Sequence, residues 1–506
     1  MQYDLTKQEW DFINNYLQSK GLPVDRNVTF GDIPMPDMYS EVRSRSEIEK
    51  AVDSFTTELY PGIKLRIPFV LANMVCVSDA EAIVAMEREG GLGIPPQMIS
   101  RKERLKILDR VGRAESAYIK NPLTIGPNKT LAEAKKLMDE YSGINSLVVV
   151  DENKKPIGIL STRDWAYEID ENRKVLDLMG GKRKLYKAAQ DISLSEASKI
   201  LRKHRIEKLP LINRKGVLTG LMTAYGLFYE RHHPRATRDD KGRFLKVGSI
   251  GVGRNFTSEH LKEVELQVRK GIAMLLIDTA RAFSINTKEA VEAVKKHFPK
   301  LPLIVGNTST PEGAKALFEW GADIVKVGIG PGEACRTREI GVGIPQLSAV
   351  AKCAAIAEMV RKSGRPATII ADGGMKSPGD VAKALIAGAN AIMSGSMFIG
   401  TEESAIEHYW NDQGLKVKDY IGSASSYAQR ERIGRGNLNR ERRAEGVVVK
   451  GVPVIGTMKE VIDQILGGLA SFMSYQGVRT VAELREKGRF DKPQSPAGLY
   501  EGVKKK

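Results

Sequence analysis

The feature that most constrains the fold is a regular alternation of short apolar runs and helical patterns. The apolar runs span residues 246–251, 274–278, 303–306, 324–328, 368–371 and 391–393. Helical spacing of apolar residues appears between them, for example over 288–296 and 350–360. Strands that alternate with helices at intervals of roughly twenty to forty residues predict a parallel sheet covered by helices.

A matching strand–helix unit lies near the N-terminus. After a helical lead-in over about the first twenty-five residues, residues 67–74 read as a buried strand and residues 80–89 as a helix that Gly90 and Gly91 end. A short strand follows at 92–94. The strands then number about eight, so we predict an α/β fold, a (β/α)₈ barrel whose active site lies at the C-terminal ends of its strands.

Residues 116–230 interrupt this rhythm and contain an internal repeat. The first copy runs from a helix at 130–140 through a strand at 146–151 to a segment at 156–164, and the second runs from a helix at 194–204 through strands at 208–213 and 216–223. The repeat resembles a tandem pair of cystathionine-β-synthase-type (CBS) domains, a module that senses adenosine nucleotides. The predicted domains are therefore 1–115 and 231–506 for the barrel and 116–230 for the insert.

The predicted strand ends carry glycine or short polar residues. They are Asn73-Met74, Asp278-Thr279, Gly306-Asn307, the 328–335 loop, Asp372-Gly373-Gly374 and the 394–397 segment. The last two follow the final two strands, where barrels commonly bind phosphate through backbone N–H groups. Together these positions predict a site for a phosphorylated ligand.

Cys335 is the candidate nucleophile. It follows a glycine-rich turn and is flanked by Arg336 and Arg338. Cationic neighbours favour the thiolate, which is the reactive form of cysteine. A buried structural cysteine is the alternative interpretation, but glycine and charge surround Cys335, whereas Cys353 lies on an apolar helical face and is expected to be core.

The composition excludes several classes of protein. Three cysteines without a CxxC pair do not support a disulfide framework or a cysteine-rich zinc site, and no segment has the apolar length of a signal peptide or a membrane span. We therefore expect a cytoplasmic protein without a membrane partner. The formal charge of +16 is spread along the chain beside many acidic residues, so we expect a solvated basic surface that suits small anionic ligands rather than nucleic acid.

Four motifs together carry a family resemblance. They are GIGPGxxCxTR at 328–338, GVGIPQ at 341–346, ADGG at 371–374 and GSMFxGTEES at 395–404. The combination resembles the inosine-5′-monophosphate (IMP) dehydrogenase and guanosine-5′-monophosphate (GMP) reductase family. The insert lies where dehydrogenases of that family usually carry a CBS pair.

The resemblance implies the chemistry and the site. Cys335 attacks C2 of the purine, a hydride passes to NAD, and the covalent thioimidate is hydrolysed to xanthosine monophosphate. Positions matching those that hold the ribose and phosphate are Asp372, Gly374, Gly395, Ser396 and Tyr420. Positions matching the nicotinamide side are Asp278, Asn307, Gly328 and Gly330. Carbonyls of Gly330, Gly332 and Cys335 match those that hold a potassium ion, and a homotetramer is implied by the resemblance alone.

The chain departs from the family pattern in two places. A mobile flap is expected at 422–447, where the family uses an Arg-Tyr pair and a Thr-Glu pair for hydrolysis. Thr337 and Glu445 match the second pair, but Ile433 follows Arg432 where the tyrosine is expected. Glu333 replaces a serine that usually touches the phosphate, and a carboxylate there repels a dianion unless a cation neutralises it.

Two alternatives to a dehydrogenase remain open. Reductases of the family need no water-activating arginine and have an arginine three residues before the glutamate, as Arg442 precedes Glu445. Such an enzyme would use NADPH, although reductases mostly lack the CBS insert. The altered flap and Glu333 also allow a hydrolysis-impaired homologue that binds nucleotides and acts in regulation.

Overall fold

The computed structural model describes most of the chain. The described residues are 3–114, 118–120, 122–140, 145–179, 184–224, 226, 228, 232–239, 242–253, 255–425 and 446–493. The chain divides into two compact units. The first comprises Met1–Leu108, Arg235–Thr237 and Leu245–Lys506, and the second comprises Asp109–Pro234 and Arg238–Phe244.

A curled parallel sheet forms the centre of the first unit. Its order is β11 (Val247–Ile250), β12 (Met274–Asp278), β13 (Leu303–Thr308), β14 (Ile324–Val327), β15 (Thr368–Asp372), β16 (Ala391–Ser394) and β3 (Phe69–Leu71). Leu92 makes a parallel bridge to Val70 of β3, and Ser249 of β11 donates a hydrogen bond of 2.7 Å to the Pro95 carbonyl. The 92–95 segment therefore lies between β3 and β11, and the predicted (β/α)₈ barrel is confirmed.

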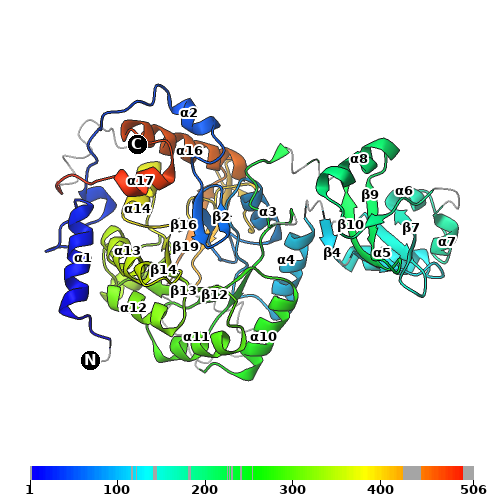
Figure 1. Ribbon diagram of the computed structural model, residues 1–506, viewed down its shortest axis with the longest axis horizontal. Helices are drawn as coiled ribbons and strands as arrows, with labels where there is room; N and C mark the ends of the chain where they lie inside the picture. Colours follow the sequence, from blue (N-terminus) through cyan, green and yellow to red (C-terminus); the bar gives the residue numbers. More distant parts are fainter. Residues whose placement is uncertain are drawn as a thin grey trace. The chain divides into compact units, whose positions relative to one another are not determined.

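Helices cover the outside of this sheet (Figure 1). Those in the strand–helix repeat are α3 (Ala80–Arg88), α10 (Ser258–Arg269), α11 (Ile285–His297), α12 (Pro311–Trp320), α13 (Gln346–Lys362) and α14 (Pro378–Ile386). The flanking helices are α1 (Lys7–Ser19), η1 (Phe30–Asp32), α2 (Arg45–Lys50), α4 (Arg101–Arg113), η2 (Thr337–Ile340), α16 (Met458–Tyr475) and α17 (Val481–Lys487). Local sequence explains their ends: the Thr310 hydroxyl caps α12, Pro311 occupies its first turn, and Gly321 ends it.

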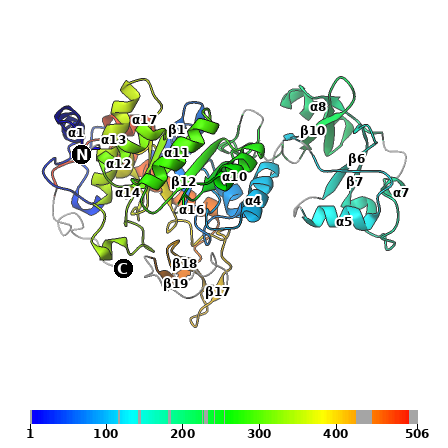
Figure 2. The same cartoon turned by 90° about the horizontal axis from the view of Figure 1, so that it is seen from below.

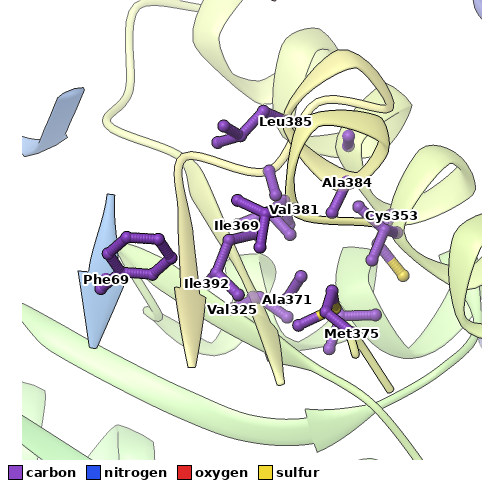
Figure 3. Close-up of a cluster of buried hydrophobic side chains, with 14 of the residues drawn as sticks. Phe69, Val325, Cys353, Ile369, Ala371, Met375, Val381, Ala384, Leu385 and Ile392 are labelled. Carbon is purple, nitrogen blue, oxygen red and sulfur yellow. The ribbon is translucent and has the colours of Figure 1, made fainter. Parts of the chain in front are cut away.

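Alternating side chains of the strands build two apolar layers. Outward-facing residues pack against the helices, as Val325, Ile369 and Ile392 do beside Cys353 and Val381 in Figure 3. Inward-facing residues fill the barrel, and they include Val70, Met274, Leu276, Ile304, Ile324, Ile370 and Met393. Each fully buried aliphatic side chain contributes about 1.5–3 kcal/mol, so the two layers hold the strand ends in fixed relative positions.

Two smaller sheets complete the first unit. One pairs β1 (Thr57–Tyr60) with β2 (Ile63–Leu65), and the other contains β17 (Tyr409–Trp410), β18 (Lys416–Ile421) and β19 (Val448–Pro453). Figure 2 shows the latter sheet projecting from one end of the barrel. Strands β18 and β19 flank the expected flap and pair with each other. The described ends of the flap therefore lie together, and Ser425 forms a β-bridge with Gly446.

The second unit consists of two halves with the same strand arrangement. In one half β5 (Thr124–Ile125) runs parallel to β6 (Ser146–Val150), which is antiparallel to β7 (Pro156–Ser161). In the other, β8 (Ala188–Ala189) is parallel to β9 (Lys208–Ile212), which is antiparallel to β10 (Leu218–Thr223). The remaining elements are β4 (Tyr118–Lys120), which pairs with β10, α5 (Leu131–Glu140), α6 (Thr162–Trp165), α7 (Val175–Leu178) and α8 (Leu194–His204).

The expected strand and helix positions agree with the structure to within a few residues. Strand β12 and helix α8 have the predicted bounds, whereas α11 and α13 extend by several residues beyond the predicted ranges. Over the described part of the chain, every helix is too short or too polar to cross a membrane.

Candidate active site

The top layer of the barrel interior is polar. Along β12 and β14 the inward positions are apolar until the last one, which is Asp278 or Lys326, and on β15 the apolar Ile370 precedes Asp372 in the same way. The period of two along a strand explains this placement, because Leu276, Ile324 and Ile370 point into the barrel two residues earlier. Gly306 is the equivalent position of β13. The apolar barrel therefore has a charged layer at its C-terminal end.

These charges form one network. The Lys326 ammonium lies 3.0 Å from Asp278 Oδ1 and 2.7 Å from Asp372 Oδ2. Asn73 donates to Asp278 Oδ2 at 2.9 Å, and Asn307 donates to Asp372 Oδ2 at 2.8 Å. Burial alone would lower the pKa of Lys326, but the two carboxylates outweigh burial and raise that pKa above its ordinary value. The ammonium therefore stays charged.

Asn307 and Gln346 anchor the cysteine loop to this network. Asn307 Nδ2 also donates to the Gly328 carbonyl at 2.8 Å, and Gln346 Nε2 donates to the carbonyls of Val327 and Asp372. Among the described residues, Asn307 Oδ1 is buried and has no hydrogen-bond partner. A buried acceptor without a partner costs free energy, so this oxygen is suited to a donor group from a ligand.

Cys335 and Thr337 lie together in the loop after β14. The Cys335 Sγ is 3.1 Å from the Thr337 Oγ1, and both residues are partly exposed. The expected role of the neighbouring arginines is not supported, since Arg336 Nε lies 3.4 Å from Glu339 and Arg338 donates to the Ile344 carbonyl. Among the described residues, the hydroxyl of Thr337 rather than a guanidinium is the polar side-chain group that contacts the thiol.

The loop also presents backbone carbonyls. The Gly332 carbonyl accepts a hydrogen bond from the Cys335 N–H at 3.1 Å, and Gly330 adopts a φ of +76° that favours glycine. A carbonyl has two lone pairs, so Gly332 keeps one for a cation. Neutral oxygen ligands of this kind fit a hard monovalent ion such as potassium.

A glycine-lined cradle lies beside the loop. Gly374 has a φ of +90°, and a Cβ there would lie 3.0 Å from Pro331 Cβ. A Cβ on Gly395 would lie only 2.6 Å from the Tyr420 hydroxyl. Ser396 is partly exposed at this edge, and Glu333 is exposed. Burial, followed by nearby groups that include Asp372 and Glu333, raises the pKa of Tyr420, so the phenol is a neutral hydrogen-bond donor.

Part of the expected flap lies outside the described residues. This applies to Arg432, Ile433, Arg442 and Glu445. The described end of the flap is close to the nucleophile, because Gly446 pairs with Cys335 in a β-bridge and Val447 N–H donates to the Ala334 carbonyl at 3.1 Å.

Other expected residues have plain surroundings. Cys353 is fully buried in α13, and burial raises its pKa. Cys76 is also buried, and burial raises its pKa to about 11. Within the described ranges there is no group of three or more His, Cys, Asp or Glu side chains that could hold a metal.

Lys326 is a site residue that was not predicted from the sequence. Its signal was a single charged residue in the apolar strand Ile324-Val325-Lys326-Val327. A lysine in a strand buried on both faces is almost never tolerated without a partner. That rule would have predicted acidic partners at neighbouring strand ends.

This chain is similar to known proteins over most of its length. The family model described as "IMP dehydrogenase / GMP reductase domain" matches residues 27–504. An inosine-5′-monophosphate dehydrogenase of Aquifex aeolicus is 38% identical over 473 residues, which cover 92% of this chain and 93% of the relative. An inosine-5′-monophosphate dehydrogenase of Halalkalibacterium halodurans is 37% identical over 481 residues, 94% of each chain.

Solved structures of a GMP reductase are also similar. A variant of the Trypanosoma brucei enzyme in complex with guanosine 5′-monophosphate has a TM-score of 0.83 and 32% identity, covering 97% of this chain and 99% of the other. The same enzyme in complex with guanosine 5′-triphosphate has a TM-score of 0.73 and 30% identity, covering 94% and 99%.

Proposed function

This chain belongs to the IMP dehydrogenase / GMP reductase family, and on that premise we propose that it is an NAD-dependent IMP dehydrogenase. The reaction converts IMP, NAD and water to xanthosine monophosphate, NADH and a proton, a step toward guanine nucleotides. Two inosine-5′-monophosphate dehydrogenases at 37–38% identity over more than nine-tenths of the chain support this reaction. The observation that carries it is the contact of 3.1 Å between the Cys335 thiol and the Thr337 hydroxyl beside the charged layer.

Cys335 is the proposed nucleophile. Its sulfur attacks C2 of the hypoxanthine ring, and the hydride that leaves C2 produces a thioimidate bound to the enzyme. NAD supplies the hydride acceptor when bound. Water then adds to C2, the C2–S bond breaks, and the thiol returns with release of xanthosine monophosphate. Thr337 is close enough to Sγ to relay a proton during these steps.

The substrates are held by two sets of groups. Asp372 accepts hydrogen bonds from the ribose hydroxyls, and backbone N–H groups with one phenol suit the phosphate. That cradle consists of Gly374, Gly395, Ser396 and Tyr420. On the nicotinamide side are Asp278, Asn307, Gly328 and Gly330. The buried, unpartnered Asn307 Oδ1 supports a carboxamide donor at that side.

Hydrolysis is assigned to the flap. Thr337 and Glu445 form the expected pair, and Arg432 is the proposed water-activating base although Ile433 replaces the usual tyrosine. An arginine loses a proton only in a strong field, because its pKa is above 12 in water. The bridge between Gly446 and Cys335 supports a flap that meets the nucleophile.

Potassium would be held by the carbonyls of Gly330, Gly332 and Cys335. These carbonyl oxygens would point their negative dipole ends at the cation, whose positive charge would order the loop around the thiol. Replacing potassium by lithium in the assay should lower the turnover number, and an equal rate in both ions would contradict this part of the proposal.

The second unit is proposed to be a tandem CBS pair that binds adenine or guanine nucleotides. Its two halves share one strand arrangement, and in the first half Asp164 accepts hydrogen bonds from the N–H and hydroxyl of Ser161 at the strand-to-helix step. Calorimetric titration with ATP and GTP tests this assignment. A cytosolic homotetramer completes the proposal, and sedimentation of the purified protein tests the tetramer.

The test of the main reaction is the absorbance of reduced nicotinamide in potassium buffer with two substrate pairs, which are IMP with NAD and GMP with NADPH. A steady rise with IMP and NAD, lost in Cys335→Ala, is the expected result. A single burst without turnover would mean that hydride transfer proceeds and hydrolysis fails, so that the chain acts as a nucleotide-binding homologue. Absence of any signal with either pair would refute an enzyme of this family's chemistry.

GMP reductase activity is the second candidate. The similar Trypanosoma brucei structures are GMP reductases, and Arg442 stands three residues before Glu445. Oxidation of NADPH with GMP, without any signal from IMP and NAD, would establish the reductase in place of the dehydrogenase.

A further inference from the structure

Lys326 is buried at the point where the two substrate sites meet. It is 3% exposed and points into the barrel directly above the Ile324 layer. The neighbouring strand makes room for it, because a Cβ on Gly306 would lie 2.4 Å from Lys326 Cβ. An ammonium in this position requires acidic partners, since burying an unpaired charge is costly.

Both partners belong to substrate sites. Asp278 ends β12 on the nicotinamide side, Asp372 ends β15 on the ribose side, and the Lys326 Nζ is within 3.0 Å of a carboxylate oxygen of each. The other polar contacts to these carboxylates come from neutral amides of Asn73 and Asn307. Within the described residues Lys326 is therefore the cation shared by two carboxylates.

The charge balance of the layer depends on this one residue. Among the described residues, the titratable groups in contact with the ammonium are Asp278 from β12 and Asp372 from β15. Tyr420 of β18 interacts electrostatically with Asp372, and also with Cys76, Glu333 and Cys335. None of these other groups is cationic. Without the ammonium, two partly exposed carboxylates would be left close together without their shared cation, and repulsion between like charges favours protonation of one of them.

We propose that Lys326 is a positioning residue that holds Asp372 and Asp278 in place as their shared counter-ion, so that nucleotide and dinucleotide binding both depend on it. The inference rests on the proposed function for what the two carboxylates bind. A protonated Asp372 would accept fewer hydrogen bonds from a ribose diol, and a displaced Asp278 would lose its place beside the nicotinamide.

Lys326→Met and Lys326→Arg test this role, with Lys383→Met as the matched control. Lys383 is 7% exposed and donates to the Phe30 carbonyl at 2.8 Å, and it forms no ion pair with a carboxylate of the described residues. Initial rates between pH 6 and 9 give the KM for each substrate. They also give the midpoint of the acidic limb of the pH dependence of kcat/KM. Thermal unfolding of all three variants reports stability separately.

The methionine variant should raise both KM values roughly ten- to hundredfold, as expected for lost hydrogen bonds to charged groups. It should also move the acidic limb upward by about one pH unit or more. Lys326→Arg should recover much of both effects because it keeps the charge. Lys383→Met should lower thermal stability and leave both KM values and the limb unchanged. Unchanged KM values and an unchanged limb in Lys326→Met would overturn the proposal.

A double variant keeps the test decisive if Lys326→Met folds poorly. Adding Asp278→Asn removes the repulsion on Asp372, so Lys326→Met/Asp278→Asn should regain stability and calorimetric IMP affinity relative to Lys326→Met alone. Failure to regain IMP affinity in a folded double variant would also refute the shared counter-ion. If wild type were inactive with both substrate pairs, the proposed function would fail. Calorimetric titration of wild type and the Lys326 variants with IMP would still test whether Lys326 supports nucleotide binding.

Discussion

Gly395→Ala is expected to weaken nucleotide binding through one side chain. The new Cβ would lie 2.6 Å from the Tyr420 hydroxyl and 3.0 Å from Met74 Sδ. Real Cβ atoms do not approach an oxygen that closely, so the phenol must retreat by a few tenths of an ångström. Tyr420 is 5% exposed and sits on β18, which pairs with β19 at Val449, and it therefore cannot move freely.

The magnitude follows from the overlap. Inserting a methyl group into a packed site costs about 1–3 kcal/mol, which corresponds to about a 5- to 150-fold change in affinity. Because Gly395 and Tyr420 belong to the proposed phosphate cradle, the KM for IMP should rise by that factor. The KM for NAD and kcat should change little, since Asp278 and Asn307 lie on other strands.

Steady-state kinetics with two further variants separate this effect from general damage. Gly379→Ala is the matched control, because its Cβ would meet only Ser377 Oγ, at 3.7 Å, in the first turn of α14. Tyr420→Phe removes the hydroxyl that causes the overlap. In that background Gly395→Ala should cost less by about 1 kcal/mol or more, which is the coupling expected of residues in contact.

Two results would contradict displacement of Tyr420 by the new methyl group. One is an equal cost of Gly395→Ala in the wild-type and Tyr420→Phe backgrounds, which would mean that the hydroxyl is not the group displaced. The other is a rise in the KM for NAD alone, which would place Gly395 outside the nucleotide cradle.

Three further predictions concern other parts of the first unit. Cys335→Ala should lower turnover by at least about 10³-fold while calorimetric IMP binding persists, because the proposed role of the thiol is to form a bond to the purine and not to hold the ribose or phosphate. Burial and the charges of Arg489 and Arg485 lower the pKa of Lys20 to about 8. Between that value and its ordinary pKa, the lysine binds more protons in the unfolded state than in the folded state. In urea titrations, the free energy of unfolding of wild type relative to Lys20→Met should therefore rise from pH 8 to 10. An equal difference in the free energy of unfolding between wild type and Lys20→Met at both pH values would exclude a lowered pKa of Lys20. Phe318→Ala should destabilise the barrel by about 3–5 kcal/mol in the same titrations, because Phe318 is fully buried in α12, and a loss below 1 kcal/mol would mean that the core refills the cavity.

Local patterns in the sequence were sufficient for the elements and for the reactive loop. The apolar runs marked β12, β14, β15 and β16 within a residue or two, because alternation along a strand and burial on both faces are properties of neighbouring residues. Glycine at 328–332 and a cysteine after it predicted a loop at a strand end for the same reason. The barrel followed from counting such units.

The partners of the site residues were decided by tertiary structure alone. Asn73 and Asp278 are 205 positions apart, and Lys326 and Asp372 are 46 apart, yet each pair is in hydrogen-bond contact. Which strands become neighbours, and which side chains then meet, depends on closure of the whole sheet. Arg336 shows the opposite case: it lies next to Cys335 in sequence, but the turn directs it to Glu339, because a side chain's direction depends on the backbone geometry of the folded loop.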